Sequence, residues 1–139
     1  MNRFTSFLFA LLMAFVFTPD GMAKAKDFTV GKNTFLIGGK PIVIKAAEIH
    51  YPRIPREYWE HRMKMCKALG MNTVCIYIFW NIHEQKEGQF DFTGNNDIAA
   101  FCRLAQKNDL YVIVRPGPYV CAEWEMCFLP WFLLNLLYF

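Results

Sequence analysis

Residues 72–79 read NTVCIYIF, a run that after its first two residues is apolar on both alternating faces. A strand that is buried on both faces has this pattern, whereas a strand with one solvated face alternates apolar and polar residues. Residues 110–114, which read LYVIV, form a second continuous apolar run. We therefore expect both runs to be strands of a sheet that is covered on both faces.

Two segments with helical spacing of apolar residues accompany these strands. The first, residues 57–69, follows Pro55 and stops at Gly70, which are helix boundary signals. The second extends from about residue 96 to residue 107. The apolar face predicted for the first helix consists of Trp59, Met63, Cys66 and Leu69, and that of the second consists of Ile98, Phe101, Cys102 and Ala105.

The segment before the first helix is rich in turn signals. Residues 28–43 read FTVGKNTFLIGGKPIV, with Gly-Lys-Asn and Gly-Gly-Lys between short β-rich runs. We expect a small hairpin here that leads into the domain. Residues 42–49 are a further strand candidate, which ends before the helix-breaking Pro52.

The predicted elements alternate as hairpin, strand, helix, strand, helix and strand. Such an order predicts an α/β fold with right-handed crossovers and a parallel sheet. In folds of this class, functional residues lie at the carboxyl ends of the strands, on the loops that lead into the helices. The segments that follow the three main strands are therefore where a site is expected.

Composition narrows the possible classes of protein. The chain has 139 residues, of which 55% are hydrophobic and 19% charged, and a formal net charge of +3. The apolar content argues against disorder, and the small net charge argues against a nucleic-acid partner, which would require a dense basic stripe. The length suits one domain at most and is too short for a complete (β/α)₈ barrel of about 250 residues.

The chain begins with an apolar segment that we interpret as a signal for export. Residues 4–17 read FTSFLFALLMAFVF, without charge, after Arg3 and before Pro19. This run is shorter than the roughly 18 to 20 residues that cross a bilayer. We interpret residues 1–23 as a secretory signal peptide, with cleavage after Ala25 as the alternative. The protein is then exported, to the periplasm or the cell exterior, and keeps no stable membrane span after cleavage, although a membrane-anchoring helix or a buried core helix remains an alternative interpretation.

The cysteines and histidines do not form a recognisable metal or disulfide pattern. An odd number of cysteines without paired spacing is not a disulfide framework, so we expect buried, unpaired thiols. No Cys-x-x-Cys pair occurs, and the three histidines lack the spacing of zinc ligands. We therefore expect no metal and no cofactor. The five cysteines are Cys66, Cys75, Cys102, Cys121 and Cys127.

Carboxylates and aromatic rings cluster directly after each main strand. The three segments are residues 48–53 (EIHYPR), 77–84 (YIFWNIHE) and 115–125 (RPGPYVCAEWE). A pyranose is bound by such groups, because its apolar C–H face packs on Trp or Tyr while a carboxylate accepts hydrogen bonds from its hydroxyls. The pattern predicts a sugar-binding site at the strand ends.

Structural roles for the same residues stay open. Glu48 and Glu84 are equally interpretable as structural carboxylates that pair with Arg53 or Arg115. The tryptophans are also interpretable as core rings, which is the commoner role of this residue. The tryptophans concerned are Trp80, Trp124 and Trp131.

At these residues the sequence resembles the glycoside hydrolase family 35 β-galactosidases. The Trp-Asn-x-His-Glu and Arg-Pro-Gly-Pro-Tyr-x-Cys-Ala-Glu-Trp segments are specific to that family. The resemblance implies that residues 28–139 are the amino-terminal portion of a (β/α)₈ TIM barrel, about three βα units with the leading hairpin. It also implies retaining exo-hydrolysis of terminal non-reducing β-D-galactose, from a β-galactoside or a galactose-terminated oligosaccharide. The matching stretches are residues 35–40 (FLIGGK), 48–55 (EIHYPRIP), 58–70 (YWEHRMKMCKALG), 72–84 (NTVCIYIFWNIHE), 88–92 (GQFDF) and 115–126 (RPGPYVCAEWEM).

The resemblance also implies which residues hold the sugar. Tyr77 matches the family tyrosine that contacts galactose. Cys121, Ala122 and Glu123 match the tripeptide that lines the galactose site, with the Glu123 carboxylate expected to accept bonds from sugar hydroxyls. The family's acid/base is a Glu that follows an Asn after the fourth strand, and its nucleophile is a Glu near the end of the seventh. This chain contains no Asn-Glu dipeptide, and neither Glu123 nor Glu125 matches a catalytic carboxylate, so we assign no catalytic residue.

The last part of the sequence departs from the family pattern. Where that pattern reads Gly-Gly-Leu-Pro-x-Trp-Leu-Leu, this chain has CFLPWFLL, with Cys127 and Phe128 in place of the two glycines. Glycine permits backbone conformations that Phe resists, so we expect the loop beside the sugar site to differ. Residues 135–139 (NLLYF) are interpreted as the end of an interrupted chain.

Three hypotheses for function remain open. The first is the beginning of an exported β-galactosidase that is inactive by itself, because both catalytic carboxylates are missing. The second is a non-catalytic remnant that binds galactose. The third is a structural or redox role of the cysteines. The matched sugar-binding segments favour the first.

Overall fold

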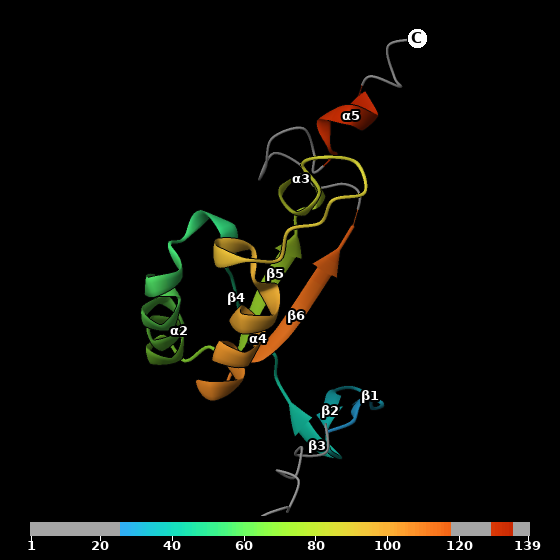
Figure 1. Cartoon of the computed structure of the whole chain (residues 1–139). Helices are drawn as coiled ribbons and strands as arrows, with labels where there is room; N and C mark the ends of the chain where they lie inside the picture. The colour runs from blue at the N-terminus through green and yellow to red at the C-terminus, as the bar shows by residue number, and fades with distance from the viewer. Residues whose placement is uncertain (1–25, 118–128, 135–139) are drawn as a thin grey trace, which may run out of the picture. The chain divides into compact units, whose positions relative to one another are not determined.

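The structure is a computed structural model that describes residues 26–117 and 129–134 (Figure 1). The chain divides into two compact units, residues 1–43 and residues 44–139. The predicted signal peptide lies outside the described residues. None of the helices in the described ranges is long and apolar enough to cross a membrane.

The first unit is a three-stranded antiparallel sheet rather than the single hairpin expected. β1 (Phe28–Val30), β2 (Phe35–Ile37) and β3 (Lys40–Ile42) pair in that order. The turn between β2 and β3 consists of Gly38 and Gly39, whose φ angles are 56° and 76°. A two-residue turn with two positive φ angles matches the right-handed twist of the strands it joins, which is why glycine serves here.

The second unit contains a three-stranded parallel sheet, as the alternating pattern predicts. β5 (Thr73–Ile78) lies between β4 (Ala46–Glu48) and β6 (Tyr111–Pro116). The strand expected over residues 42–49 is split between the two units. Ile42 pairs antiparallel with Phe35 in the first sheet, and the strand that joins β5 starts only at Ala46.

Helix α2 (Trp59–Ala68) follows a 3₁₀ turn (Arg56–Tyr58) and ends at the residue pair Leu69 and Gly70. Gly70 has φ 79°, its N–H bonds the Lys67 carbonyl, and the Met71 N–H bonds the Cys66 carbonyl. These two hydrogen bonds around a residue in the left-handed conformation form a Schellman motif, which ends the helix.

The face predicted for α2 is confirmed for three of its four residues. Trp59, Met63 and Cys66 are buried, but Leu69 is 72% exposed. Leu69 is the C-cap of the helix, with ψ near 3°. At Leu69 the backbone no longer has helical geometry, so the helical periodicity does not place its side chain on the buried face.

Helix α4 (Ile98–Lys107) is capped at both ends. The Asp97 carboxylate accepts from the Ala100 N–H at 2.8 Å, which satisfies one of the free amides of the first turn. At the other end Asp109 adopts a positive φ of 53°. The Asp109 N–H bonds the Gln106 carbonyl and the Leu110 N–H bonds the Ala105 carbonyl, so this helix also ends in a Schellman motif.

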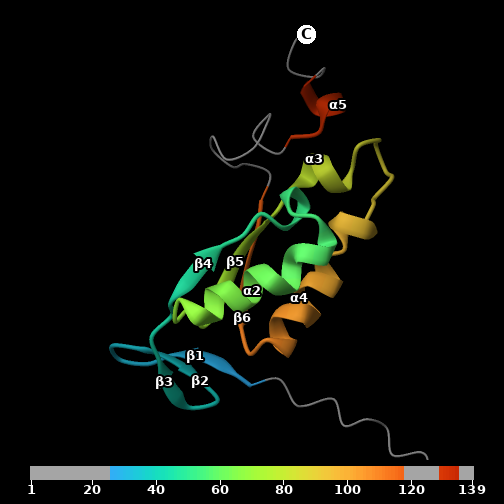
Figure 2. The same cartoon turned by 90° about the vertical axis from the view of Figure 1, so that its left-hand side faces the viewer.

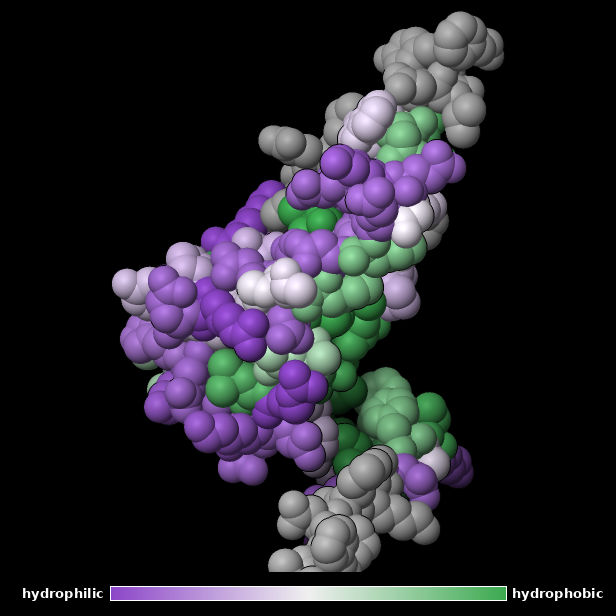
Figure 3. Space-filling model, in the orientation of Figure 1, coloured by the Kyte–Doolittle hydropathy of each residue, from purple (hydrophilic) through white to green (hydrophobic). Residues whose placement is uncertain are grey.

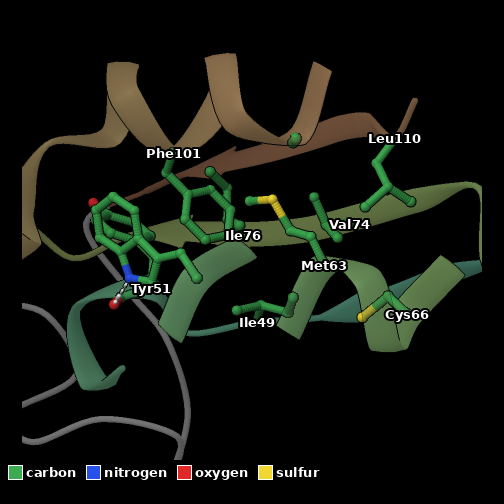
Figure 4. Close-up of a cluster of buried hydrophobic side chains, with 10 residues drawn as sticks. Ile49, Tyr51, Met63, Cys66, Val74, Ile76, Phe101 and Leu110 are labelled. Carbon is green, nitrogen blue, oxygen red and sulfur yellow. Dashed lines mark hydrogen bonds between the residues drawn. The ribbon is translucent and has the colours of Figure 1, made fainter. Parts of the chain in front are cut away.

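The core of the second unit lies between the sheet and these two helices. Figures 1 and 2 show α2 and α4 on the same side of the sheet. Val74 and Ile76 of β5 point to this side and pack with Met63 of α2 and Phe101 of α4 (Figure 4). Each such side chain, when fully buried, stabilises the fold by about 1.5–3 kcal/mol. The complete cluster is Ile49, Tyr51, Trp59, Met63, Cys66, Val74, Ile76, Phe101, Ala105 and Leu110.

The described helices cover only one face of the sheet. On the face away from the helices, Tyr111 and Ile113 of β6 are 42% and 36% exposed. Figure 3 shows hydrophobic surface where Figure 1 draws β6. The continuous apolar run at residues 110–114 predicted a strand covered on both sides. Within the described residues, the second cover is absent.

Candidate functional site

The carboxyl ends of the three parallel strands carry a connected group of polar and aromatic side chains. Because side chains alternate along a strand, Glu48, Tyr77 and Arg115 all lie on the face of the sheet opposite the helices. The alternate residues, among them Ala47 and Val74, pack in the core beneath the helices. The site is thus built on the face that the described helices leave open.

Arg115 links the other two side chains. In the register of the sheet it lies directly opposite Tyr77, and its guanidinium carbon is 4.1 Å from the centroid of the Tyr77 ring. Its Nη1 is 3.3 Å from Oε2 of Glu48, across the intervening strand β5. The pairing of Glu48 with an arginine, one of the alternatives left open by the sequence, is therefore present.

The other oxygen of Glu48 is held by His50. His50 Nε2 lies 3.2 Å from Glu48 Oε1, and His50 Nδ1 lies 3.4 Å from Nη1 of Arg53. A carboxylate only accepts and a guanidinium only donates, so Nε2 carries the proton and Nδ1 accepts. The imidazole edge also packs on Tyr77, at 5.9 Å between ring centroids.

Tyr77 is enclosed by these neighbours. Its side chain is 7% exposed and packs with Phe79, which is fully buried. The sequence assigned Tyr77 to the sugar site, and the structure places it at the carboxyl end of the central strand. Its contact with a sugar stays a prediction. The other assigned residues, Cys121, Ala122 and Glu123, lie outside the described residues, as do Trp124, Glu125, Cys127 and Phe128.

Glu84 is a structural carboxylate, but not through an arginine. It is 6% exposed, and its Oε1 accepts from the Gly88 N–H at 2.7 Å. Its Oε2 accepts from Nε1 of Trp80, one turn earlier in α3 (Trp80–His83). Of the alternatives left open by the sequence, the structural role of Glu84 is therefore present, but its partners are local donors rather than Arg53 or Arg115.

A buried tyrosine–histidine pair beside the site was not predicted. The Tyr51 hydroxyl is 2.5 Å from His83 Nε2, and His83 Nδ1 is 2.8 Å from the Asp91 carbonyl. Burial raises the pKa of Tyr51 above its ordinary range, with a smaller contribution from Cys102. Both residues lie in the family-matched stretches, but nothing in the sequence shows that they contact each other across the 32 positions between them.

Two of the three tryptophans, Trp80 and Trp131, lie in the described residues, and only the first packs against a buried cluster. Trp80 is half-buried beside Tyr77 and Phe79. Trp131, in the short helix α5 (Trp131–Leu134), is 60% exposed, so it is not a core ring. Its Nε1 donates to the Gln85 carbonyl at 2.9 Å, which attaches α5 to the segment after α3.

The described cysteines are free thiols. Cys66 is buried, whereas Cys75 and Cys102 are half-buried. Burial raises the pKa of the Cys66 and Cys102 thiols, which keeps them protonated and weakly nucleophilic. Among the residues that the structure describes, no group of His, Cys, Asp or Glu could hold a metal ion.

An open groove of about 450 Å³ adjoins the polar group on the helix side of β4. Its polar lining includes Glu48, His50 and Arg53, and its apolar lining includes Met65 of α2 and the C-cap residue Leu69. Tyr77 does not line it. Glu48 and His50 thus adjoin this groove as well as Tyr77, which lies on the face of the sheet away from the helices.

Comparison with known proteins defines the class of this chain. The sequence model for "Glycosyl hydrolases family 35" matches residues 34–137. The chain is 55% identical over 91 residues to the β-galactosidase of Xanthomonas manihotis, covering 66% of this chain and 15% of that protein. It is 44% identical over 116 residues to the β-galactosidase of Canis lupus familiaris, covering 81% of this chain and 17% of that protein. By these relationships the chain falls in the class of the glycoside hydrolase families.

Within that class, the chain belongs to glycosyl hydrolase family 35. Another similar relative is β-galactosidase-1-like protein 2 of Homo sapiens. It is 46% identical over 113 residues, which cover 81% of this chain and 17% of that protein. The chain thus spans about a sixth of the length of these curated relatives.

A solved structure has a similar fold. It is the exo-β-1,4-mannosidase Op5Man5 from Opitutaceae bacterium strain TAV5, with a TM-score of 0.52 at 16% identity. The similarity covers 65% of this chain and 17% of that one. At this identity the comparison supports the α/β architecture alone.

Proposed function

We propose that this chain is the amino-terminal, galactose-holding part of a retaining exo-β-galactosidase. Its substrate is then a β-galactoside or a galactose-terminated oligosaccharide. The observation that carries the proposal is the position of Tyr77, at the carboxyl end of the central parallel strand between the Arg115 guanidinium and the His50 imidazole. Tyr77 lies inside the family-matched segment, and the family's tyrosine at this position contacts the sugar.

The chemistry of the strand ends suits a pyranose. The edge and hydroxyl of a tyrosine offer one apolar and one polar contact to a sugar, and nearby carboxylates accept from its hydroxyls. Glu48 lies on the same face as Tyr77, with its carboxylate paired to Arg115. Glu123 follows β6 in the sequence, and in our proposal it supplies the carboxylate for the galactose hydroxyls, together with Cys121 and Ala122.

The proposed architecture is the first three βα units of a (β/α)₈ barrel. The parallel order β4-β5-β6, with helices on one face and polar side chains at the carboxyl ends, supports it. In such a barrel the open face of the sheet, with Tyr77 and Arg115, becomes the interior, and the site lies at its upper rim.

We also propose that these 139 residues do not hydrolyse galactosides by themselves. Retaining hydrolysis needs two carboxyl groups about 5 to 5.5 Å apart, one as nucleophile and one as acid and base. The family's acid/base follows an asparagine, and the sequence contains no Asn-Glu dipeptide. Residues 1–23 act in this proposal as the signal that exports the protein.

The experiment uses the purified full chain and two readouts. Galactose binding is followed by titration calorimetry, and hydrolysis by release of nitrophenol from a nitrophenyl β-galactoside. We expect saturable binding that Tyr77→Phe weakens, and no release of nitrophenol. Tyr58→Phe is the matched control, because Tyr58 is 54% exposed on the 3₁₀ turn before α2. Nitrophenol release by the chain would disprove the inactivity, and absence of galactose binding would disprove the galactose-holding role.

A further inference from the structure

We infer that Arg115 and Glu48 form a positioning pair that sets the orientation of the Tyr77 ring for galactose binding. This inference rests on the proposed function, since the tyrosine is the group that it places in contact with the sugar. Neither Arg115 nor Glu48 is among the residues that the family resemblance assigns to the sugar. Their role is to hold the tyrosine, not to touch the substrate.

The topology of the sheet makes this arrangement possible. Each of the three parallel strands contributes one member, Glu48 from β4, Tyr77 from β5 and Arg115 from β6. Arg115 is the register partner of Tyr77, so its side chain starts beside the ring. To reach Glu48 it must extend over β5, and this path lays the guanidinium over the ring face, 4.1 Å from the centroid.

Two contacts fix the guanidinium in this position. One is the stacking on the Tyr77 ring, in which a cation lies over the negative face of the aromatic system. The other is the ion pair with Glu48 at 3.3 Å. The Glu48 carboxylate is in turn held by the His50 N–H at 3.2 Å, and His50 accepts from Arg53 at 3.4 Å. The orientation of the ring therefore depends on a chain of polar contacts that extends to the turn after β4.

The exposure of the pair argues against a role in overall stability. The side chains of Arg115 and Glu48 are 49% and 41% exposed. Ion pairs of such exposure contribute little to folding because water screens them and holding long side chains costs entropy. The Tyr77 side chain below them is 7% exposed. The pair thus covers the Tyr77 ring with polar atoms, and we expect it to have little effect on the unfolding midpoint.

Arginine is required here rather than any cation. A guanidinium is planar, stacks on an aromatic face and donates in its plane to a carboxylate at the same time. A lysine ammonium could keep the attraction to Glu48 but not the flat contact with the ring. Arg115→Lys should therefore restore the ion pair without restoring the ring orientation.

The test compares Arg115→Met, Arg115→Lys and Glu48→Gln with the unmodified chain. Arg103→Met is the matched control, because Arg103 is an exposed arginine on α4 in the same unit. The first readout is the ring signal of Tyr77 in NMR spectra of the full chain with labelled tyrosine, assigned by its loss in Tyr77→Phe. The second is the dissociation constant for galactose.

We expect the Tyr77 ring signal to shift in Arg115→Met and Arg115→Lys, and to shift in the same direction but less in Glu48→Gln. Arg103→Met should leave it unchanged. The dissociation constant should rise about two- to fivefold in Arg115→Met, the change that corresponds to loss of an exposed cation–π contact. Unfolding midpoints should stay close to that of the unmodified chain.

The outcomes separate this inference from the proposed function. An unchanged ring signal in Arg115→Met, or a full return to the original signal in Arg115→Lys, overturns the positioning of the ring. A shifted ring signal with an unchanged dissociation constant overturns its role in binding. Absence of galactose binding by the unmodified chain overturns the proposed function, while the ring signal still reports whether the pair orients Tyr77.

Discussion

The hydroxyl of Tyr51 lies 2.5 Å from Nε2 of His83, and both side chains are buried. The hydrogen bond joins the turn after β4 to helix α3 after β5. Because the Asp91 carbonyl only accepts, His83 Nδ1 must donate to it, and Nε2 is then the acceptor for the tyrosine proton. One buried bond therefore ties together two of the segments that surround the candidate site.

Replacing Tyr51 by Phe should destabilise the fold by about 1–3 kcal/mol, because His83 Nε2 loses its partner in a buried place. Urea unfolding followed by circular dichroism measures the change. Tyr58→Phe, at an exposed tyrosine, should change the free energy of unfolding by less than about 0.5 kcal/mol. Equal effects of the two substitutions would show that the buried bond contributes nothing.

The stability of the protein should also fall at alkaline pH through Tyr51. Burial raises the pKa of Tyr51 in the folded state, while a tyrosine in the unfolded chain titrates at about 10. Above about pH 10 the unfolded chain releases this proton and the folded protein keeps it, so the free energy of unfolding decreases as pH rises. The contribution of the protonated Tyr51 to the free energy of unfolding is complete below about pH 10 and is lost as pH rises toward the folded-state pKa.

Urea unfolding from about pH 8 to about pH 11 tests this dependence. Tyr51→Phe should have the shallower decline above pH 10, by up to about 1.4 kcal/mol per pH unit. Tyr58→Phe should decline as the unmodified protein does. Parallel curves for the unmodified protein and Tyr51→Phe would contradict the effect of burial on this hydroxyl.

Glu84 should be required for stability. Glu84→Ala removes the acceptor of both the Gly88 N–H and the Trp80 indole N–H, at a cost of about 2–3 kcal/mol. Glu84→Gln retains one acceptor oxygen and should cost about half as much. Thermal unfolding gives the ranking, with the exposed Glu87→Ala as control. A fully stable Glu84→Ala protein would refute the structural role of this carboxylate.

The two helix ends should respond to substitution with opposite signs. Gly70 has φ 79° and space around its Cβ position, so Gly70→Ala should destabilise by about 1 kcal/mol through backbone strain alone. Asp109 adopts φ 53° with a side chain, so Asp109→Gly should stabilise by about 0.5–1 kcal/mol. The bond from Lys67 to the Asp109 carbonyl uses only the backbone of residue 109 and is retained. Free energies of unfolding that change with the same sign would contradict this account of the caps.

The sequence predicted the parallel sheet and both long helices, because these elements depend on local periodicity. The stripes through Met63 and Phe101 are set by residues three and four apart, and both side chains are buried as expected. The periodicity misled at Leu69, where capping geometry rather than hydrophobicity decides the direction of the side chain. The strand pattern also predicted Ile42 and β4 as one strand, although they belong to two different sheets. A strand pattern does not show with which partner strand each residue pairs.

The candidate site was predicted only in part. Its location at the strand ends follows from the fold class, and Tyr77 follows from the family resemblance. The contact of Arg115 with Glu48 joins residues 67 apart and depends on the register of three strands, which the sequence does not display. The Tyr51–His83 bond was missed for the same reason.

The most direct test of the central claim is a titration of the purified chain with galactose and, separately, with its epimer glucose. The account predicts saturable binding of galactose, weaker binding of glucose, and loss of affinity for galactose in Tyr77→Phe but not in Tyr58→Phe. Absence of saturation with galactose, or equal affinity for the two sugars that is unaffected by Tyr77→Phe, would contradict it.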